Sequence, residues 1–386
     1  ISNLAVKNWR NFRHAEADFR EVTYVIGANA TGKSNFLEVF RFLRDIAKIH
    51  GGGFQQAVKD RGGVTKIRCL HARSKPLVEI KITVVNDLED LSDGWEYAIA
   101  FQSENKGTRR PILTKETVTR IKDNRRKIFL NRPDDRDESD HELLTQTALE
   151  QIHSNAEFRE IKEFFSDMTY LHLVPQLVKY GEFIGGRQLE SDPFGQGFLT
   201  RVAAATDKVR QSRLNRIQKT LSSAIPQFEQ LRFQPDELGH PHLEAKYTHH
   251  RPLAGWQRED QFSDGTLRLI ALCWLLLEGD SVLLLEEPEL SLDEEIVRQL
   301  PRLIESARKS SKKKPRQIII STHSSAILSN RAIDGRGVLR LERVSEGTVI
   351  HKPSESELFE MKAGFSPADV ILRKVHSSKT HQMDLL

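Results

Sequence analysis

The chain has 386 residues, 38% of them hydrophobic and 29% charged, which is enough for a sizeable core and for more than one lobe. Its formal charge of +4 permits contact with nucleic acid but does not indicate it. Cys69 and Cys273 are far apart in unlike contexts, so we expect no disulfide framework and a reducing, cytoplasmic location. No apolar run approaches the roughly 20 residues of a membrane span, so we expect neither a membrane partner nor a secretory leader.

The opening of the chain alternates between strand and turn signals. Strands are predicted at residues 4–6 and 22–26, and the second of them stops at Gly27. Apolar residues then recur at helical spacing over 33–49, and three consecutive glycines end this helix.

The middle of the chain is less regular. Further strands are predicted at 77–85 and 95–101. Residues 105–140 are crowded with charges of both signs, which favours a long hairpin or an exposed insertion, most simply a solvated surface. Residues 140–167 are mostly helical in pattern, and 170–177 are predicted to form a buried strand.

The remainder begins with a basic helical stretch at 200–224 and mixed strands up to residue 253. Strands and helices then alternate: strands at 281–285, 317–321 and 338–341, helices at 293–310 and 324–329. Such alternation predicts a mostly parallel sheet covered by helices. We therefore expect an α/β fold with an N-terminal lobe over 1–195, containing a mixed sheet, and a C-terminal lobe over 196–386. No sustained heptad pattern is present, so no long coiled coil is expected.

Residues 27–34 fit the phosphate-binding loop pattern of glycine, four residues, glycine, lysine and serine, between a predicted strand and a predicted helix. In such loops the glycines let successive amides and the helix N-terminus face the phosphates. Lys33 would neutralise the β- and γ-phosphates of a nucleotide, and the Ser34 hydroxyl would bind Mg²⁺. The candidate nucleotide-binding residues here are Gly27, Asn29, Ala30, Thr31, Gly32, Lys33, Ser34 and Asn35.

Residues 283–289 form an apolar strand that ends in consecutive acids. After such strands in phosphate-loop enzymes, the first acid holds Mg²⁺ and a second can act as general base toward water. We assign Glu286 to the metal and Glu287 to the base. A charged turn after a buried strand is the simpler alternative.

Two further segments indicate phosphate recognition. His323 ends the buried strand 318–322, where it could hydrogen-bond to a γ-phosphate, although strand-end histidines are more often structural. Ser263 and Gly265 stand at the start of the apolar helix 269–277, where a capped helix N-terminus forms a second phosphate cradle. An ordinary capped helix is the alternative for this segment.

The order of these motifs resembles that of the ATP-binding-cassette ATPases. The motifs are the loop at 27–34, the serine–glycine signature at 263–265, the acidic strand at 283–287, Ser291-Leu292-Asp293, and His323. The resemblance implies a P-loop NTPase fold, ATP and Mg²⁺ as cofactors, and two heads that clamp two ATP molecules between them. It implies that Ser263 and Gly265 grip the γ-phosphate of ATP held by the partner subunit, that Asp293 couples the two sites, and that His323 is the switch histidine.

The opening segment 6–13 resembles that of heads from chromosome-maintenance (SMC), recombination-repair (RecF-type) and overcoming-lysogenisation-defect (OLD) proteins. Without a coiled coil, the chain looks most like the compact bacterial ATPases of the AAA-21-type group. Residues 255–266 are similar to those of small ATPases encoded beside a Toprim-like nuclease in anti-phage islands. The chain ends at Leu386, too soon after His323 for a fused Toprim domain, so the resemblance implies an effector nuclease in trans.

Four features depart from the pattern or extend it. Ala30 replaces a glycine common in transporter loops, and Glu286 stands where aspartate is usual. Gln176 is the candidate for the metal-contacting glutamine, with a buried or surface glutamine as the alternative. Arg10 is a candidate phosphate contact, against a plain surface turn residue.

A basic helix is the preferred contact surface for DNA or a partner protein; its cations are Lys208, Arg210, Arg213, Arg216 and Lys219. The basic run 308–316 is better explained as a solvated loop.

The sequence thus predicts a Mg²⁺-dependent ATPase that forms an ATP-sandwiched homodimer and regulates an effector in anti-phage defence. A repair ATPase of the RecF type and a nucleotide-gated scaffold that does not hydrolyse ATP are the alternatives. The signature Phe262-Ser263-Asp264-Gly265-Thr266 disfavours a transporter subunit. No tight acid or His/Cys cluster elsewhere has metal-ligand spacing, so an intrinsic nuclease is not expected.

Overall fold

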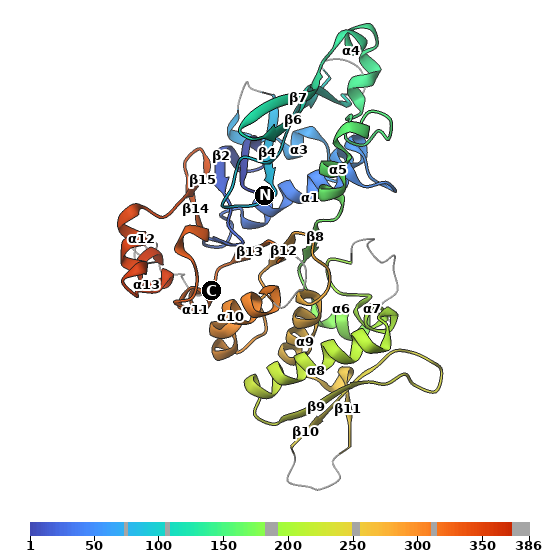
Figure 1. The fold of residues 1–386 in the computed structure, drawn as a ribbon, viewed down its shortest axis with the longest axis vertical. Helices are drawn as coiled ribbons and strands as arrows, with labels where there is room; N and C mark the ends of the chain where they lie inside the picture. The colour runs from blue at the N-terminus through green and yellow to red at the C-terminus, as the bar shows by residue number, and fades with distance from the viewer. Residues whose placement is uncertain (73–75, 105–108, 182–191, 249–254, 310–314, 373–386) are drawn as a thin grey trace, which may run out of the picture.

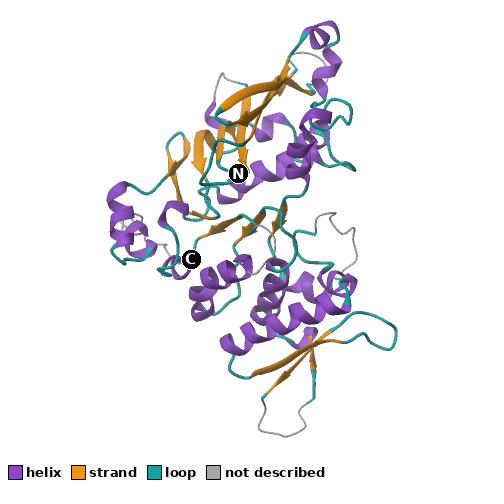
Figure 2. Ribbon diagram, viewed as in Figure 1, coloured by secondary structure: helices purple, strands orange, loops and turns teal. Residues whose placement is uncertain are grey.

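The computed structural model describes the chain except residues 73–75, 105–108, 182–191, 249–254, 310–314 and 373–386. Its strands form three sheets, which Figures 1 and 2 show stacked along the long axis of the molecule. Over the described residues, no helix is long and apolar enough to cross a membrane.

The N-terminal sheet has the order β2-β1-β4-β5-β6-β7, and every neighbouring pair is antiparallel. Its strands are β1 (Asn3–Trp9), β2 (Phe12–Asp18), β4 (Val78–Val85), β5 (Gly94–Ser103), β6 (Pro111–Lys122) and β7 (Arg125–Arg132). Buried and exposed residues alternate along β2 and β4 because one face of an antiparallel sheet packs on the core. This sheet is antiparallel throughout, where the sequence had indicated a mixed one.

The charged segment 105–140 contains a long hairpin, as one of its two interpretations predicted. Strands β6 and β7 are joined by Asp123 and Asn124, whose φ angles of 48° and 61° form the tight turn that matches strand twist. The segment is not merely a solvated surface, because Arg132, at the end of β7, and Asp137 are buried in an ion-pair network.

The central sheet has the order β15-β14-β3-β13-β12-β8, and all pairs except β14–β15 are parallel. Its strands are β3 (Val22–Ile26), β8 (Thr169–Leu171), β12 (Leu283–Glu286), β13 (Ile318–Thr322), β14 (Val338–Val344) and β15 (Gly347–His351). The parallel strands read as continuous apolar runs because both of their faces are buried. The expectation of a mostly parallel sheet is confirmed.

Two hydrophobic clusters lie on opposite faces of the central sheet. Leu284 and Tyr170 face the cluster that holds helix α1 (Lys33–Ala47) and the N-terminal sheet. Leu283 and Leu285 face the cluster of α8 (Asp207–Ala224), α9 (Asp264–Leu276) and α10 (Glu294–Lys309). In Figure 1, α1 lies above the central strands and α8, α9 and α10 lie below them.

The third sheet, β11-β10-β9, lies at the far end of the helical region (Figure 2). Its strands are β9 (Phe228–Phe233), β10 (Leu243–Tyr247) and β11 (Gln257–Arg258). The remaining helices are α2 (Phe54–Lys59), α3 (Val64–Ile67), α4 (Asp135–Ser139), α5 (Arg159–Ser166), α6 (Pro175–Tyr180), α7 (Phe198–Ala204), α11 (Ser325–Leu328), α12 (Glu355–Lys362) and α13 (Pro367–Ile371). The longest described helix, α8, has 18 residues, so the described chain contains no long coiled coil.

Two element predictions in the middle of the chain were wrong. The strand predicted at 170–177 ends at Leu171, because Pro175 occupies the first turn of helix α6, a position that suits its fixed φ. The stretch 140–167 is mostly turns and short 3₁₀ segments, and regular α-helix is confined to α5.

Candidate nucleotide-binding site

The predicted site motifs meet at the carboxyl ends of β3, β12 and β13, three adjacent strands of the central sheet. Glu286 ends β12 and is paired with Ser321 of β13, whose last residue, Thr322, is paired with Ile26 of β3. The loop after β3, the acids after β12 and His323 after β13 therefore leave the same edge of the sheet. In α/β folds, this edge is where ligands bind.

The phosphate-binding loop is tightly turned. Gly32 has φ 98°, and a Cβ atom there would lie 2.0 Å from the side-chain nitrogen of Asn11, so only glycine fits. Ala30 has φ 64°, a left-handed conformation that usually favours glycine. The Lys33 ammonium points back over the loop and donates to the carbonyl oxygens of Gly27 and Ala28 at 2.9 and 3.2 Å.

Asn11, in the turn between β1 and β2, clamps the loop from outside. Its amide nitrogen donates to the Thr31 carbonyl at 2.9 Å and to the Thr348 hydroxyl at 2.7 Å. Its amide oxygen accepts from Asn35 at 2.8 Å, and Thr348 also donates to the Thr31 carbonyl. Nothing in the local sequence pattern identifies Asn11, because its partners come from distant parts of the chain.

Glu286 is held by three neighbours. The Ser34 hydroxyl donates to Oε1, and the Tyr170 hydroxyl donates to Oε2 at 2.6 Å. His172, just beyond β8, lies with Nδ1 3.3 Å from the backbone oxygen of Glu286. Tyr170 and His172 were missed by the sequence analysis, although a strand that pairs beside the acidic strand is the place to look for such residues.

Glu287 is fixed by a second set of contacts. It has φ 44°, its backbone nitrogen donates to Ser321, and its backbone oxygen accepts from the buried Arg268 guanidinium at 2.9 Å. Its carboxylate lies 3.2 Å from Nδ1 of His323. The two residues assigned to general-base and switch roles are thus in direct contact.

A third acid, Glu289, lies beneath this pair. Its Oε1 accepts from the Thr322 hydroxyl at 2.6 Å and from the backbone nitrogen of His323. Its Oε2 is buried without a hydrogen-bond partner among the described residues. Glu289 therefore supports the backbone turn that presents His323.

The electrostatics of this edge favour a cation. Burial lowers the pKa of Lys33, and the negative charges of Glu287, Glu289 and Glu286 oppose that effect. Burial and the nearby Glu286 charge raise the pKa of Tyr170, so its hydroxyl keeps its proton and remains a donor. A serine hydroxyl beside a glutamate carboxylate is the all-oxygen set that Mg²⁺ prefers, so Ser34 and Glu286 fit this ion.

The signature segment lies at the start of α9, which packs on the opposite face of the central sheet from α1. Ser263 caps α9, where its hydroxyl accepts from the Thr266 backbone nitrogen at 3.2 Å. A Cβ atom at Gly265 would lie 2.5 Å from the carbonyl oxygen of Ser291, so glycine is needed for this packing. Asp293, two residues beyond Ser291, is exposed.

Two candidates have other contacts in this structure. The Gln176 amide, on α6, donates to Asp264 of the signature segment at 2.8 Å. The Arg10 guanidinium donates to the Lys66 carbonyl at 3.0 Å, and burial lowers its pKa. After β8, it is His172 that contacts the acidic strand, whereas Gln176 contacts the signature segment.

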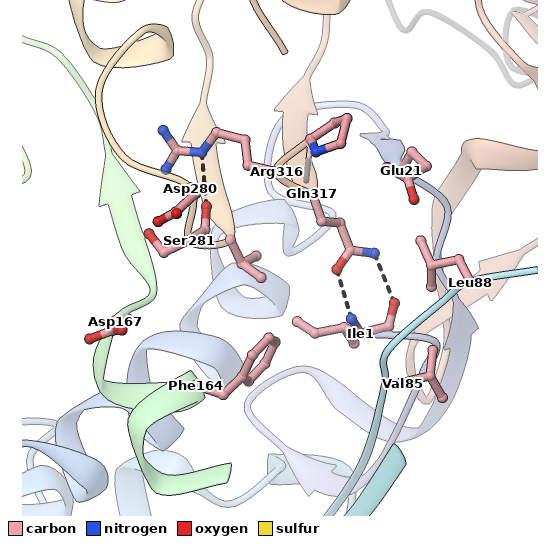
Figure 3. Close-up of a pocket in the computed structure, with 12 residues that line it drawn as sticks. Ile1, Glu21, Val85, Leu88, Phe164, Asp167, Asp280, Ser281, Arg316 and Gln317 are labelled. Carbon is pink, nitrogen blue, oxygen red and sulfur yellow. Dashed lines mark hydrogen bonds between the residues drawn. The ribbon is translucent and has the colours of Figure 1, made fainter. Parts of the chain in front are cut away.

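A cavity of about 420 Å³ lies at the opposite edge of the central sheet, near the amino ends of β12 and β13. Figure 3 shows Gln317 bonded to Ile1, and Arg316 bonded to Ser281, at its wall. None of the predicted site residues lines it, so this cavity is separate from the candidate nucleotide site.

The central sheet with its loop–helix unit after β3, flanked by an antiparallel sheet, has the fold of an ATPase head of the ABC and SMC-like class. Residues 22–329 match the family described as "AAA domain, putative AbiEii toxin, Type IV TA system", and the chain belongs to this family. No curated protein matched the sequence.

One solved SMC head shares the fold. It is described as "SmcHead bound to the C-winged helix domain of ScpA", with 14% identity, a TM-score of 0.53, and 93% of this chain and 99% of that chain covered. An SMC head domain from Thermotoga maritima has 15% identity, a TM-score of 0.46 and coverage of 92% and 98%. An Smc head with an extended coiled coil, bound to the C-terminal domain of ScpA derived from Pyrococcus furiosus, has 14% identity, a TM-score of 0.49 and coverage of 94% and 98%.

Proposed function

We propose that this protein is a Mg²⁺-dependent ATPase that closes as an ATP-sandwiched homodimer and regulates an effector protein. The observation that carries the proposal is the pair of contacts at the mouth of the loop, Ser34 with Glu286 and His323 with Glu287. They support an assignment in which Ser34 and Glu286 bind the metal and Glu287 and His323 act as base and histidine, close to the lysine of the loop.

Each residue has a role in this proposal. Lys33 and the loop amides bind the phosphates, and Ser34 and Glu286 hold Mg²⁺, which would neutralise phosphate charge. The Glu287 carboxylate accepts the proton of the attacking water, and the contact from Arg268 to its backbone keeps that carboxylate in place. His323 donates a hydrogen bond toward the terminal phosphate and orients Glu287.

The homodimer is supported by the position of the signature. Helix α1, which carries the loop, and helix α9, which carries the signature, pack on opposite faces of the central sheet. Ser263 is exposed at the start of α9. A second copy related by a two-fold axis would bring its Ser263 and Gly265 to the loop, and the two ATP molecules would be enclosed between the heads.

The effector is proposed to be a Toprim-like nuclease acting in trans, in anti-phage defence. The resemblance of residues 255–266 supports this, and so does the family description, since a toxin–antitoxin system has two components. One solved head of similar fold is bound to a domain of another protein. Purification of the tagged ATPase from its native host tests the proposal: we expect a Toprim-like nuclease to co-purify, and recovery of the ATPase dimer alone would count against it.

A DNA-repair ATPase is the second candidate, because α8 presents the exposed cations Lys208, Arg216 and Lys219. The other two cations of this helix are turned inward: Arg210 donates to the backbone oxygens of Ala203 and Ala205, and Arg213 lies over the ring of Trp274. Tight DNA binding by the ATPase alone, falling steeply with salt, would favour this candidate.

The mass of the protein with and without ATP, for the wild type and for Glu287→Gln, tests the main proposal. We expect ATP to lock the variant as a dimer, while the wild type turns over at least about 100 times faster. A wild type that binds ATP without measurable turnover would favour the nucleotide-gated scaffold. If both proteins keep the mass of a monomer in the presence of ATP, the ATP-sandwiched homodimer is contradicted.

A further inference from the structure

Both carboxylate oxygens of Glu286 have their own partner. Oε1 accepts from Ser34 at the start of α1, and Oε2 accepts from the Tyr170 hydroxyl on β8 at 2.6 Å. A glutamate has one more rotatable bond than an aspartate, so an unanchored Glu286 would distribute its oxygens over more positions. The contact with Tyr170 removes that freedom.

The Tyr170 ring is itself held in place. Residues Tyr170 and Leu284 are paired on neighbouring parallel strands, and Glu286 follows Leu284 by two positions, so the three side chains share a face of the sheet. The Arg41 guanidinium lies 4.2 Å from the centre of the Tyr170 ring, and Arg41 pairs with Glu38 at 2.6 Å. Both of these residues are on α1, the helix that begins at the phosphate-binding loop.

We propose that Tyr170 is a positioning residue for the magnesium site, which fixes the Glu286 carboxylate so that Oε1 faces Ser34. This inference rests on the proposed function, in which Ser34 and Glu286 hold Mg²⁺. Helix α1 thus reaches the carboxylate by two routes, directly through Ser34 and indirectly through Arg41 and Tyr170. Second-sphere contacts of this kind orient a ligand before the metal binds.

The pairing should be specific for glutamate at position 286. An aspartate is shorter by one methylene and would withdraw its carboxylate from the Tyr170 hydroxyl. The Tyr170 hydroxyl therefore reaches the carboxylate only when residue 286 is a glutamate. The effect of removing the hydroxyl should depend on which acid is present at position 286.

The test measures how strongly Mg²⁺ improves nucleotide binding, as the ratio of the dissociation constants of a fluorescent ATP analogue in EDTA and in Mg²⁺. It is made in the Glu287→Gln background, so that hydrolysis does not interfere. We expect Tyr170→Phe to lower this ratio about tenfold. The affinity in EDTA should stay unchanged, because the loop and Lys33 are untouched.

Two comparisons make the result specific. In a Glu286→Asp background, adding Tyr170→Phe should leave the ratio unchanged. Tyr24→Phe is the matched control, since Tyr24 is also buried in the central sheet but lies on its opposite face. Thermal melting of every variant separates these effects from misfolding.

The outcomes distinguish the inference from the proposed function. An unchanged ratio in Tyr170→Phe, a higher one, or an equal loss in both backgrounds would overturn the positioning role of Tyr170. If Mg²⁺ does not improve nucleotide binding in the starting protein, it is the proposed magnesium site that fails.

Discussion

Asn11 illustrates how the phosphate-binding loop depends on residues outside its motif. It links the carbonyl of Thr31 to Asn35 and to Thr348, which are contributed by α1 and β15. The loop could be predicted from its sequence because its glycines, lysine and serine all lie within residues 27–34. Asn11 could not be predicted, because its role arises only when three distant segments meet.

Removing the Asn11 amide should loosen the loop. Asn11→Ala leaves the partners at Thr31, Asn35 and Thr348 short of hydrogen bonds in a partly buried position, so we expect a loss of about 1–3 kcal/mol in unfolding free energy. ATP binding should weaken as well. Denaturant titration and nucleotide titration check the two effects. Asn3→Ala, which removes only exposed contacts, is the control and should leave both quantities unchanged.

Glu150 provides a prediction about pH. Its Oε2 accepts from the backbone nitrogen of Phe54 at the start of α2, and burial, together with the nearby Glu116, raises its pKa from 4.5 to about 7. Between these two values the folded protein binds more protons than the unfolded one, so this group lowers stability as pH rises through that range. Above about pH 7, the loss of unfolding free energy caused by Glu150 no longer grows and stays at roughly 3 kcal/mol.

Glu150→Gln should remove this pH dependence, because the amide oxygen still accepts from Phe54 but carries no charge. We expect the variant to melt at a higher temperature than the wild type near pH 8, and the difference to shrink toward about pH 5. Melting curves of both proteins across this range provide the measurement. A difference that stays constant with pH would show that Glu150 does not titrate as the structure indicates.

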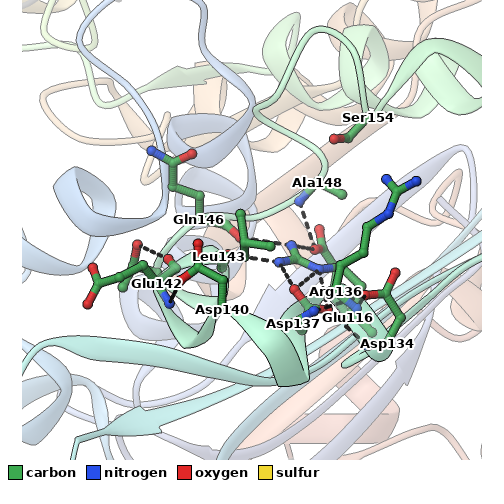
Figure 4. Close-up of polar contacts among 12 residues, drawn as sticks. Glu116, Asp134, Arg136, Asp137, Asp140, Glu142, Leu143, Gln146, Ala148 and Ser154 are labelled. Carbon is green, nitrogen blue, oxygen red and sulfur yellow. Dashed lines mark hydrogen bonds and ion pairs between the residues drawn. The ribbon is translucent and has the colours of Figure 1, made fainter.

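At the scale of elements, the β6–β7 hairpin is anchored by a buried charge network. Arg132 pairs with Glu116 at 3.2 Å and with Asp137 at 2.6 Å, and the backbone nitrogen of Ala148 donates to Glu116 at 2.8 Å. Figure 4 shows the hydrogen bond from Ala148 to Glu116, with Asp137 close by. The network joins the hairpin to α4 and to the segment before α5.

Arg132→Ala should destabilise the hairpin strongly. It leaves Glu116 and Asp137 buried without their cation, which typically costs about 3–5 kcal/mol. We expect a lower denaturation midpoint and faster proteolysis within β6 and β7. Arg136→Ala, an exposed change close by, should alter the unfolding free energy by no more than about 0.5 kcal/mol. Equal stability of the two variants would argue against an anchoring role.

The success of element prediction varied with the strength of local signals. Strands β12 and β13 were found because their apolar runs are uninterrupted, and α1 was found because its apolar residues recur at helical spacing. The segment after Leu171 was misassigned because an apolar run of this length suits a strand or a helix equally, and only the position of Pro175 in space decides between them. The antiparallel order of the N-terminal sheet depends on long-range pairing that no local pattern records.

At the scale of the whole molecule, the helices that carry the two halves of the proposed site, α1 and α9, pack on opposite faces of the central sheet. The motif order in the sequence singled out Ser34, Glu286, Glu287 and His323, and in the structure Ser34 contacts Glu286 and His323 contacts Glu287. Ser263 belongs to the other face, so a single copy supplies only part of each proposed site. In the proposal, each site is completed by the signature of the partner subunit in a dimer.

Mixing two inactive variants tests that dimer directly. Lys33→Ala removes the loop lysine, and Ser263→Arg blocks the signature with a bulky cation, so each variant alone should lose ATP turnover. In a mixed dimer one site carries both defects and the other carries neither. Random mixing makes half of the dimers mixed, and each has one intact site of two, so we expect about a quarter of wild-type turnover. Turnover in the mixture no higher than in either variant alone would mean that the loop and the signature do not act across a dimer interface.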